Sequence, residues 1–275
     1  MWLTLIMFFA LFGLVIGSFL NVVVLRLEAD KTLDGRSKCP SCGTTIRWYD
    51  NVPVLSFFLL GRRCRVCHFP VSWQYPAVEL LTGILFAVFG MFAFGDGTTV
   101  EIVRVLWLLF LISLMVVIAV YDARNMEIPL VLLLVGVVGA FGYALLTTGL
   151  SSVNWLDPAA PWREMLWGGV FAAAIFYALV YFSKETWMGM GDVWLAGVVG
   201  AAAGFSALLL LLTLSFFTGA VVGSVLLFTG KRGMKSQVPF APFLAAGTLT
   251  TLLLQLIQPW WLTFLLIPSV WFGVV

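Results

Sequence analysis

The sequence predicts an all-α polytopic membrane protein, with about eight transmembrane helices and a small zinc-binding cytoplasmic insertion between the first two. Three observations predict this class. The 275-residue chain is 62% hydrophobic and only 10% charged, whereas ordinary soluble domains are roughly one-quarter charged. Several apolar runs reach the length of about 20 residues that a helix needs to cross the hydrocarbon core of a bilayer. The one long polar region contains all four cysteines.

The expected crossings follow one another along the chain. The first run, residues 1–25, has no basic residue before it and no small-residue cleavage site after it, which favours a permanent anchor over a removed signal peptide. The stretch 193–230 is too long for one crossing, and glycines and alanines at 200–204 divide it into a short helix near 192–203 and a longer one near 206–229. The other crossings are expected at 76–94, 102–120, 128–147, 164–182 and 241–257. The Trp-rich tail is expected to be interfacial or a ninth crossing.

Basic residues orient the chain. With the N-terminus outside, all of the 15 Lys and Arg residues except Arg104 and Arg163 fall in cytoplasmic loops, as the positive-inside rule requires. Topology and anionic lipid explain the basic surplus, so the bilayer is an expected partner and nucleic acid is not. The predicted organisation is therefore a first transmembrane helix at 1–25, a cytoplasmic insertion at 26–75 and a helical bundle at 76–275.

The insertion has the spacing of a structural zinc site. Two Cys-x-x-Cys pairs, Cys39 with Cys42 and Cys64 with Cys67, are separated by residues 43–63. Each pair supplies two thiolates from one tight turn, and four thiolates close a tetrahedral coordination sphere without leaving a position for water. Disulfides are the alternative, but they are disfavoured in a reducing compartment. His68, the only histidine, is expected to be a solvated or packing residue rather than a ligand.

Two acids lie at ends of apolar runs on the predicted cytoplasmic side. Asp122 follows "VVIAVY", and Asp192 follows Gly189-Met190-Gly191. Ionisable residues at such positions are costly and are candidates for function. For each acid a second interpretation as an interfacial cap is equally open, and Asp192 in particular could be the N-cap of its helix, since acids are favoured at helix N-termini.

Chemistry favours the interpretation of these acids as a catalytic pair. Two carboxylates in a partly desolvated site share one proton, so that one acts as base toward water while the other donates to the scissile carbonyl. The sequence offers no Ser-His triad and no His-Glu-x-x-His helix. Gly189 and Gly191 would allow the backbone to approach an extended substrate.

Several longer motifs resemble those of the type IV prepilin peptidases, bifunctional leader peptidases and N-methyltransferases that contain a Gly-x-Gly-Asp motif. The resemblance covers nearly the whole chain. It is carried by the two cysteine pairs and by "GSFLNVVVLRL", "IRWYDNVPVLSFFLLG", "VSWQYPAVELLTG", "YDARNMEIP", "GMGD" and "PFAPFLAAG".

The resemblance implies that Asp122 and Asp192 cut the leader from type IV prepilins or type II secretion pseudopilins after a Gly, at the cytoplasmic face of the bacterial inner membrane. It also implies S-adenosylmethionine-dependent methylation of the new N-terminus, associated with the zinc-binding insertion. Polar residues of the matched motifs are candidates for the methyl-donor or amine site: Asn21, Arg26, Tyr49, Asp50 and Glu79. Ordinary alternatives for two of them are an ion pair of Glu79 with an arginine and a turn at Asp50.

Two other classes of function compete with a peptidase. A non-catalytic membrane adaptor would use the zinc knuckle to recruit a cytoplasmic partner, with the two acids as helix caps. A transporter is disfavoured, because its acids are expected near mid-membrane depth, whereas Asp122 and Asp192 lie at one edge.

Overall fold

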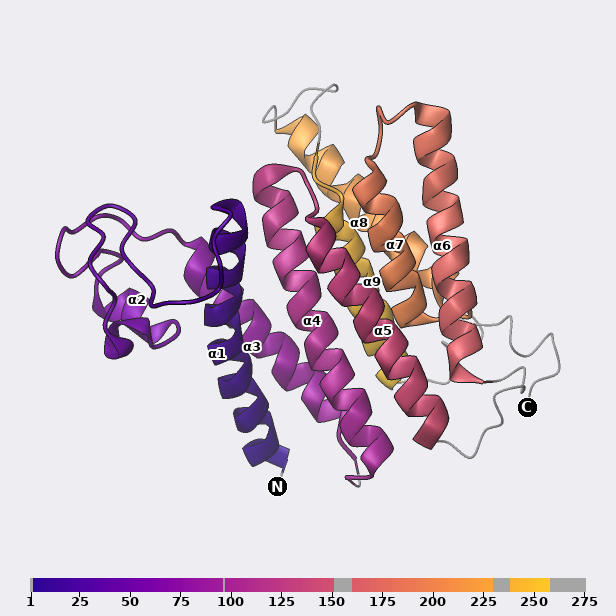
Figure 1. The fold of residues 1–275 in the computed structure, drawn as a ribbon, viewed down its shortest axis with the longest axis horizontal. Coiled ribbons are helices and arrows are strands. Elements are labelled where there is room, and N and C mark those ends of the chain that lie inside the picture. Colours follow the sequence, from indigo (N-terminus) through magenta and orange to yellow (C-terminus); the bar gives the residue numbers. More distant parts are fainter. Residues whose placement is uncertain (1, 96, 151–159, 230–237, 258–275) are drawn as a thin grey trace. The chain divides into compact units, whose positions relative to one another are not determined.

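The computed structural model describes residues 2–95, 97–150, 160–229 and 238–257 (Figure 1). These residues are mainly helical, and no strand longer than an isolated bridge occurs among them. The elements in chain order are α1 (Trp2–Glu28), the 3-10 helix η1 (Trp48–Asn51), α2 (Leu55–Leu59), α3 (Gln74–Ala93), α4 (Thr99–Asn125), α5 (Leu130–Leu150), α6 (Pro161–Ser183), α7 (Met190–Ala203), α8 (Leu208–Phe228) and α9 (Ala241–Ile257).

Six of these helices, α1, α3, α4, α5, α6 and α8, are long and apolar enough to cross a membrane. Two shorter apolar helices, α7 and α9, complete the set of about eight that the sequence predicts. The all-helical, multi-pass fold class is therefore confirmed. The predicted interfacial or ninth segment, after residue 257, lies outside the described residues.

Helix α4 is longer than the predicted crossing at 102–120, because capping signals extend it at both ends. At its start the Thr98 hydroxyl accepts from the Glu101 N–H (3.3 Å), and the Glu101 carboxylate accepts from the Thr98 N–H (3.2 Å), a capping box. At its end Met126 adopts a left-handed conformation and its N–H donates to the carbonyl of Asp122 (2.8 Å). Asp122 therefore lies in the last turn of the helix.

The chain forms two compact units, the first comprising residues 1–94 and 108–117 and the second residues 95–107 and 118–275. In the first unit α1 and α3 pack antiparallel at very short range. A Cβ atom at Gly13 would lie 2.7 Å from the carbonyl oxygen of Thr82, and one at Gly17 would lie 2.8 Å from Cα of Glu79. Small residues of this kind allow two membrane helices to approach backbone to backbone.

The polar insertion connects α1 to α3 within the first unit. It contains η1, α2 and both cysteine pairs. Phe57 of α2 is buried and packs against the ring of Trp73, with centroids 5.0 Å apart. The insertion is thereby fastened to the residue that precedes α3.

In the second unit, glycines bring α6 and α7 together. A Cβ atom at Gly168 would lie 2.8 Å from the carbonyl carbon of Gly204, and one at Gly200 would lie 2.5 Å from Cβ of Ala172. The backbones of the two helices are therefore in direct contact, with no layer of larger side chains between them.

Helices α8 and α9 form a second close pair in this unit. A Cβ atom at Gly247 of α9 would lie 2.8 Å from the backbone nitrogen of Ser215 of α8. Helix α9 is also bonded to α7, because Nε2 of Gln255 donates to the carbonyl of Ala203 (3.0 Å). Close packing and one polar bond thus connect α9 to two different helices.

We expect Gly168→Ala to destabilise the second unit by about 1–3 kcal/mol, because the added methyl group has to push two backbones apart. Gly223→Ala on α8 is the matched control, since a Cβ atom there would meet nothing within 4 Å. Thermal unfolding of the two variants in detergent measures the difference. Equal melting temperatures for the two variants would contradict the proposed packing constraint.

Candidate active site and metal centre

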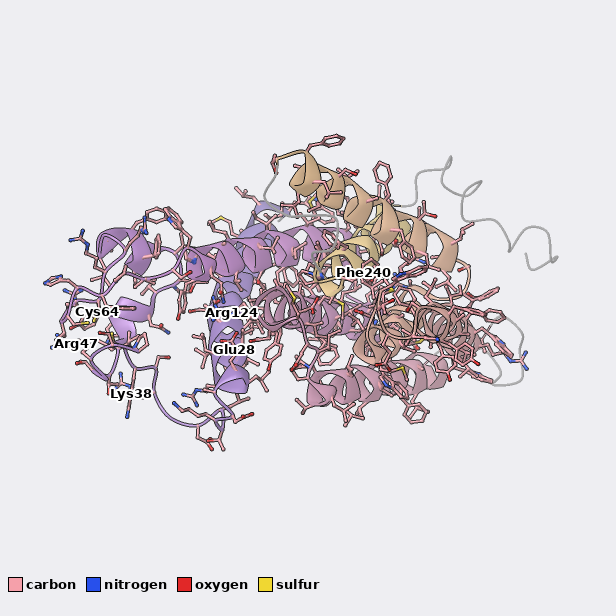
Figure 2. The ribbon with its side chains drawn as sticks, turned by 90° about the horizontal axis from the view of Figure 1, so that it is seen from above. Glu28, Lys38, Arg47, Cys64, Arg124 and Phe240 are labelled. Atoms are coloured by element: carbon pink, nitrogen blue, oxygen red, sulfur yellow. The ribbon has the colours of Figure 1, made fainter. Side chains whose placement is uncertain are left out.

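The four cysteines of the insertion form one cluster in the first unit, whose member Cys64 is labelled in Figure 2. All four Sγ atoms lie within 4.8 Å of one another. Cys39 Sγ and Cys67 Sγ are 3.7 Å apart, and none of the four thiols forms a disulfide. Sulfurs around a tetrahedral zinc with bonds of about 2.3 Å are separated by about 3.8 Å. The cluster therefore fits a tetrathiolate metal site.

Each cysteine pair is held in the same tight turn. In the first turn the Cys39 N–H donates to the carbonyl of Thr44 (2.9 Å), and the Gly43 N–H donates to the carbonyl of Cys39 (2.9 Å). The second turn repeats this pattern. The Cys64 N–H donates to the carbonyl five residues later, and the Cys64 carbonyl accepts from the N–H four residues later. The two turns are thus structural copies, as a site built from two equivalent pairs of ligands requires.

The electrostatics of the cluster favour the thiolate form at Cys42 and Cys64, whereas burial and the neighbouring thiols raise the pKa of Cys67 to about 11. The hydroxyl of Thr44, 3.3 Å from its sulfur, lowers the pKa of Cys42 to about 6. Backbone N–H groups of Cys67 and Val66 also lower the pKa of Cys64. A lower pKa increases the fraction of thiolate, which is the form that binds metal.

His68 is not one of the four clustered ligands and has an unusual backbone conformation. It occupies the position in the second turn that Gly43 occupies in the first, and both have a left-handed backbone, with φ of +56° and +67°. A side chain in this conformation costs roughly 1–2 kcal/mol.

We therefore expect His68→Gly to keep its metal and to stabilise the insertion by about 1 kcal/mol, since glycine removes the steric cost. Gly43→His is the matched reverse change and should destabilise the insertion by a similar amount. Metal content per chain and thermal unfolding measure both effects. Loss of metal in His68→Gly would show instead that the imidazole is a ligand.

The candidate residues for the methyl-donor or amine site fall into two groups, of which the first shapes the insertion. Arg26 donates to the carbonyls of Thr32 (2.9 Å) and Gly35 (2.7 Å) and also to that of Asp34. Its guanidinium group thereby closes the loop that follows α1.

Asp50 and Tyr49 belong to the same group, because both contact Arg65, which lies between Cys64 and Cys67. The Asp50 carboxylate accepts two bonds of 3.0 Å from Nε of Arg65, and these hydrogen bonds raise the pKa of Arg65. The Arg65 guanidinium also lies over the ring of Tyr49, 5.6 Å from its centroid. The two residues thus connect η1 to the second cysteine turn, a contact that neither the candidate site role nor the alternative of a simple turn at Asp50 had included.

Asn21 and Glu79, by contrast, are buried where α1 packs against α3. The Glu79 carboxylate accepts from the Val54 N–H (2.7 Å), which ties the start of α2 to α3. The Asn21 amide donates to the carbonyls of Gly17 (3.3 Å) and Tyr75 (3.2 Å), while its Oδ1 has no partner among the described residues. The contact found for Glu79 is this bond to Val54, in place of the ion pair with an arginine that was its ordinary alternative.

Both candidate catalytic acids belong to the second unit. Asp122 is 5% exposed, and its Oδ2 accepts from the N–H of Ala241, the first residue of α9 (3.0 Å). Asp192 is the third residue of α7, and its Oδ2 accepts from the Gly189 N–H (3.3 Å). Asp192 thus caps the start of α7 from its third position, whereas the N-cap residue itself is Gly189. This role is compatible with catalysis because a capping carboxylate keeps a second oxygen.

The neighbourhoods of the two acids meet. Gly191, next to Asp192, packs against Ile128 in the loop after α4, and a Cβ atom on this glycine would lie 3.4 Å from Cβ of Ile128. The structure thus brings the regions of the two acids together, although they are far apart in the sequence.

One contact at this site was not predicted from the sequence, namely the amide of Ala241. The flanking residues contain the signal for it, because Pro242 stands at the second position of α9 and proline is typical of a helix start. What the sequence does not contain is the partner of the amide, which lies on another helix.

Six helices able to span a membrane and four clustered thiols define this chain as a multi-pass membrane protein with a cysteine cluster suited to a metal ion. Two family models match it: "Bacterial Peptidase A24 N-terminal domain" over residues 11–93 and "Type IV leader peptidase family" over residues 109–224. No solved structure matches the chain.

Several relatives are named prepilin leader peptidase/N-methyltransferase, and three of them represent the set. The protein from Myxococcus xanthus (strain DK1622) is 36% identical over 84% of this chain and 66% of its own length. The one from Bacillus subtilis (strain 168) is 30% identical over 87% of this chain and 90% of its own length. The one from Aeromonas hydrophila is 31% identical over 92% of this chain and 92% of its own length. The chain therefore belongs to the prepilin leader peptidase/N-methyltransferase family, and the resemblance of its motifs is confirmed. Membership of this family makes the chain an enzyme and not a non-catalytic adaptor.

Proposed function

We propose that the chain is an aspartyl endopeptidase that removes the leader from type IV prepilins or type II secretion pseudopilins after a Gly. Asp122 and Asp192 are the catalytic pair in this proposal, and Gly189 and Gly191 give the substrate access to the backbone beside Asp192. The observation that supports it most directly is that both acids belong to one compact unit, where each accepts a hydrogen bond from a backbone N–H at the start of a helix.

The proposed reaction uses the two carboxyl groups with one proton between them. The ionised acid takes a proton from a water molecule as the water oxygen attacks the scissile carbonyl carbon, while the other acid donates its proton to the carbonyl oxygen. The tetrahedral intermediate then collapses with cleavage of the C–N bond: the proton taken from water passes to the leaving amine, and one hydroxyl of the intermediate returns a proton to the acid that had donated it. No covalent enzyme intermediate is needed, so one oxygen of each acid is sufficient.

Localisation is part of the same proposal. The basic residues favour a topology with the N-terminus outside and both acids at the cytoplasmic face of a bacterial inner membrane. A prepilin with its leader in the cytoplasm would present its cleavage site to that face. The membrane helices would thus hold enzyme and substrate at the same depth.

We also propose that the chain methylates the new N-terminus. Residues 26–75 would serve this activity, and residues 76–275 would serve peptide hydrolysis. S-adenosylmethionine, when bound, would supply the electrophilic methyl group.

Polar groups of the first unit support a site for the amine. The buried Oδ1 of Asn21 and the carboxylate of Glu79 are hydrogen-bond acceptors, as an amine requires. Arg26, Tyr49 and Asp50 would complete the site by shaping the insertion.

Zinc is the metal that we propose for the cysteine cluster. Cys39, Cys42, Cys64 and Cys67 would close its coordination sphere, which assigns the metal a structural role. A polar segment of this length has too few apolar residues for a core of its own, so a metal would stabilise its fold.

Asp122→Asn and Asp192→Asn should each reduce leader removal by at least about 100-fold, because each change deletes one of the two acid–base groups. Asp34→Asn, an identical change at an exposed position of the insertion, is the matched control. Mass spectrometry of a coexpressed prepilin measures the loss of the leader. Normal cleavage by both variants would falsify the aspartyl mechanism.

Replacing all four cysteines with serine should abolish metal binding and methylation but leave leader removal within about threefold of the wild type, since the acids belong to a different compact unit. The same mass spectra report the added methyl group and the lost leader separately. Unchanged methylation by a metal-free protein would contradict the division of labour between the insertion and the bundle.

A further inference from the structure

Helix α9 begins with an amide that reaches an acid on another helix of the second unit. The N–H of Ala241 donates to Oδ2 of Asp122 at 3.0 Å, and both residues are buried. The first N–H groups of a helix have no partner within the helix. The Ala241 N–H therefore requires an acceptor from elsewhere, and a carboxylate is a stronger acceptor than a neutral oxygen.

The position of this amide is fixed independently of Asp122. The carbonyl of Phe240 accepts from the N–H groups of Phe243 (3.0 Å) and Leu244 (3.1 Å), which sets the direction of the first turn. The Phe240 ring, labelled in Figure 2, packs against Phe176 of α6 and Phe216 of α8, with centroids 5.8 and 5.4 Å apart. An aromatic cluster thus holds the start of α9 in place.

We infer that the backbone N–H of Ala241 is a positioning group for peptide hydrolysis: it holds one oxygen of Asp122 and directs the other, Oδ1, toward water and substrate. This inference rests on the proposed catalytic role of Asp122. The amide does not touch the reacting atoms itself.

The physical advantage is twofold. A hydrogen bond from a fixed backbone group keeps the carboxylate oriented and needs no reorganisation at the moment of reaction. The positive end of the α9 dipole also favours the ionised form of the acid in a site that is poor in water. Asp192 has a comparable bond at the start of α7, but its donor lies three residues away at the start of the same helix, so only Asp122 depends on a second helix.

An amide-to-ester change tests the inference without altering any side chain. Lactic acid in place of Ala241, introduced by nonsense suppression, replaces the N–H with an oxygen. We expect kcat for leader removal to fall by about 10- to 100-fold, the rate change that corresponds to losing one hydrogen bond to a charged group. KM should stay within about twofold, since binding of the substrate does not involve this bond.

The matched control is the same ester at Ala245, one turn later in α9. There the change removes an ordinary hydrogen bond within the helix, so a merely structural effect would appear equally in both proteins. The inference is overturned if the two esters have the same kcat, or if the ester at 241 raises KM and leaves kcat unchanged.

Ala241→Pro provides a second route in case the ester protein does not fold. Proline is tolerated at the first position of a helix and also lacks the N–H. It should lower kcat at least as much as the ester, and a normal kcat in a correctly folded Ala241→Pro protein overturns the inference.

Asp122→Asn, measured in parallel, separates this inference from the proposed function. If Asp122→Asn retains cleavage, the catalytic role of Asp122 itself fails. If Asp122→Asn is inactive while both Ala241 variants keep normal kcat, only the positioning role of the amide fails.

Discussion

The hydrogen bond between a buried carboxylate and the first amide of a helix is the interaction on which the second unit depends. A carboxylate away from water needs donors to replace its hydration, and a helix start needs an acceptor for amides that have no partner. Asp122 and α9 satisfy each other in this way, and Asp192 and α7 do so within a single turn. One hydrogen bond thus lowers two costs, that of placing an acid in an apolar bundle and that of starting a helix there.

The first unit applies the same principle at Glu79. Its carboxylate accepts from the N–H of Val54, which has a φ of +60° that is unusual for a β-branched residue. The bond holds the strained start of α2 against α3. The ion pair of Asp50 and Arg65 then links η1 to the second cysteine turn. A polar segment with a small core is thereby tied both to the membrane helices and to its own cysteine cluster.

Much of this arrangement could be predicted from the sequence, because its signals are local. Apolar runs of sufficient length predicted the membrane helices, and the spacing of the four cysteines predicted their cluster. The contacts of Asp122, Glu79 and Asp50 could not be predicted, because each joins a side chain to a group that becomes its neighbour only in the folded chain. The start of α4 at Thr99 has a signal in the sequence, the Thr98 and Glu101 capping box, whereas its end at Asn125 is set by the left-handed backbone of Met126, a residue type that does not mark a helix end.

The glycine contacts between α6 and α7 have a consequence for motion. Two helices whose backbones touch at Gly168 and Gly200 have no side-chain layer between them that could slide or repack. They should therefore move as one rigid body, and Asp192 should travel with α6. Any adjustment of the distance between the two acids would then fall to the segment that carries Asp122, which reaches the start of α9 through the hydrogen bond from Ala241.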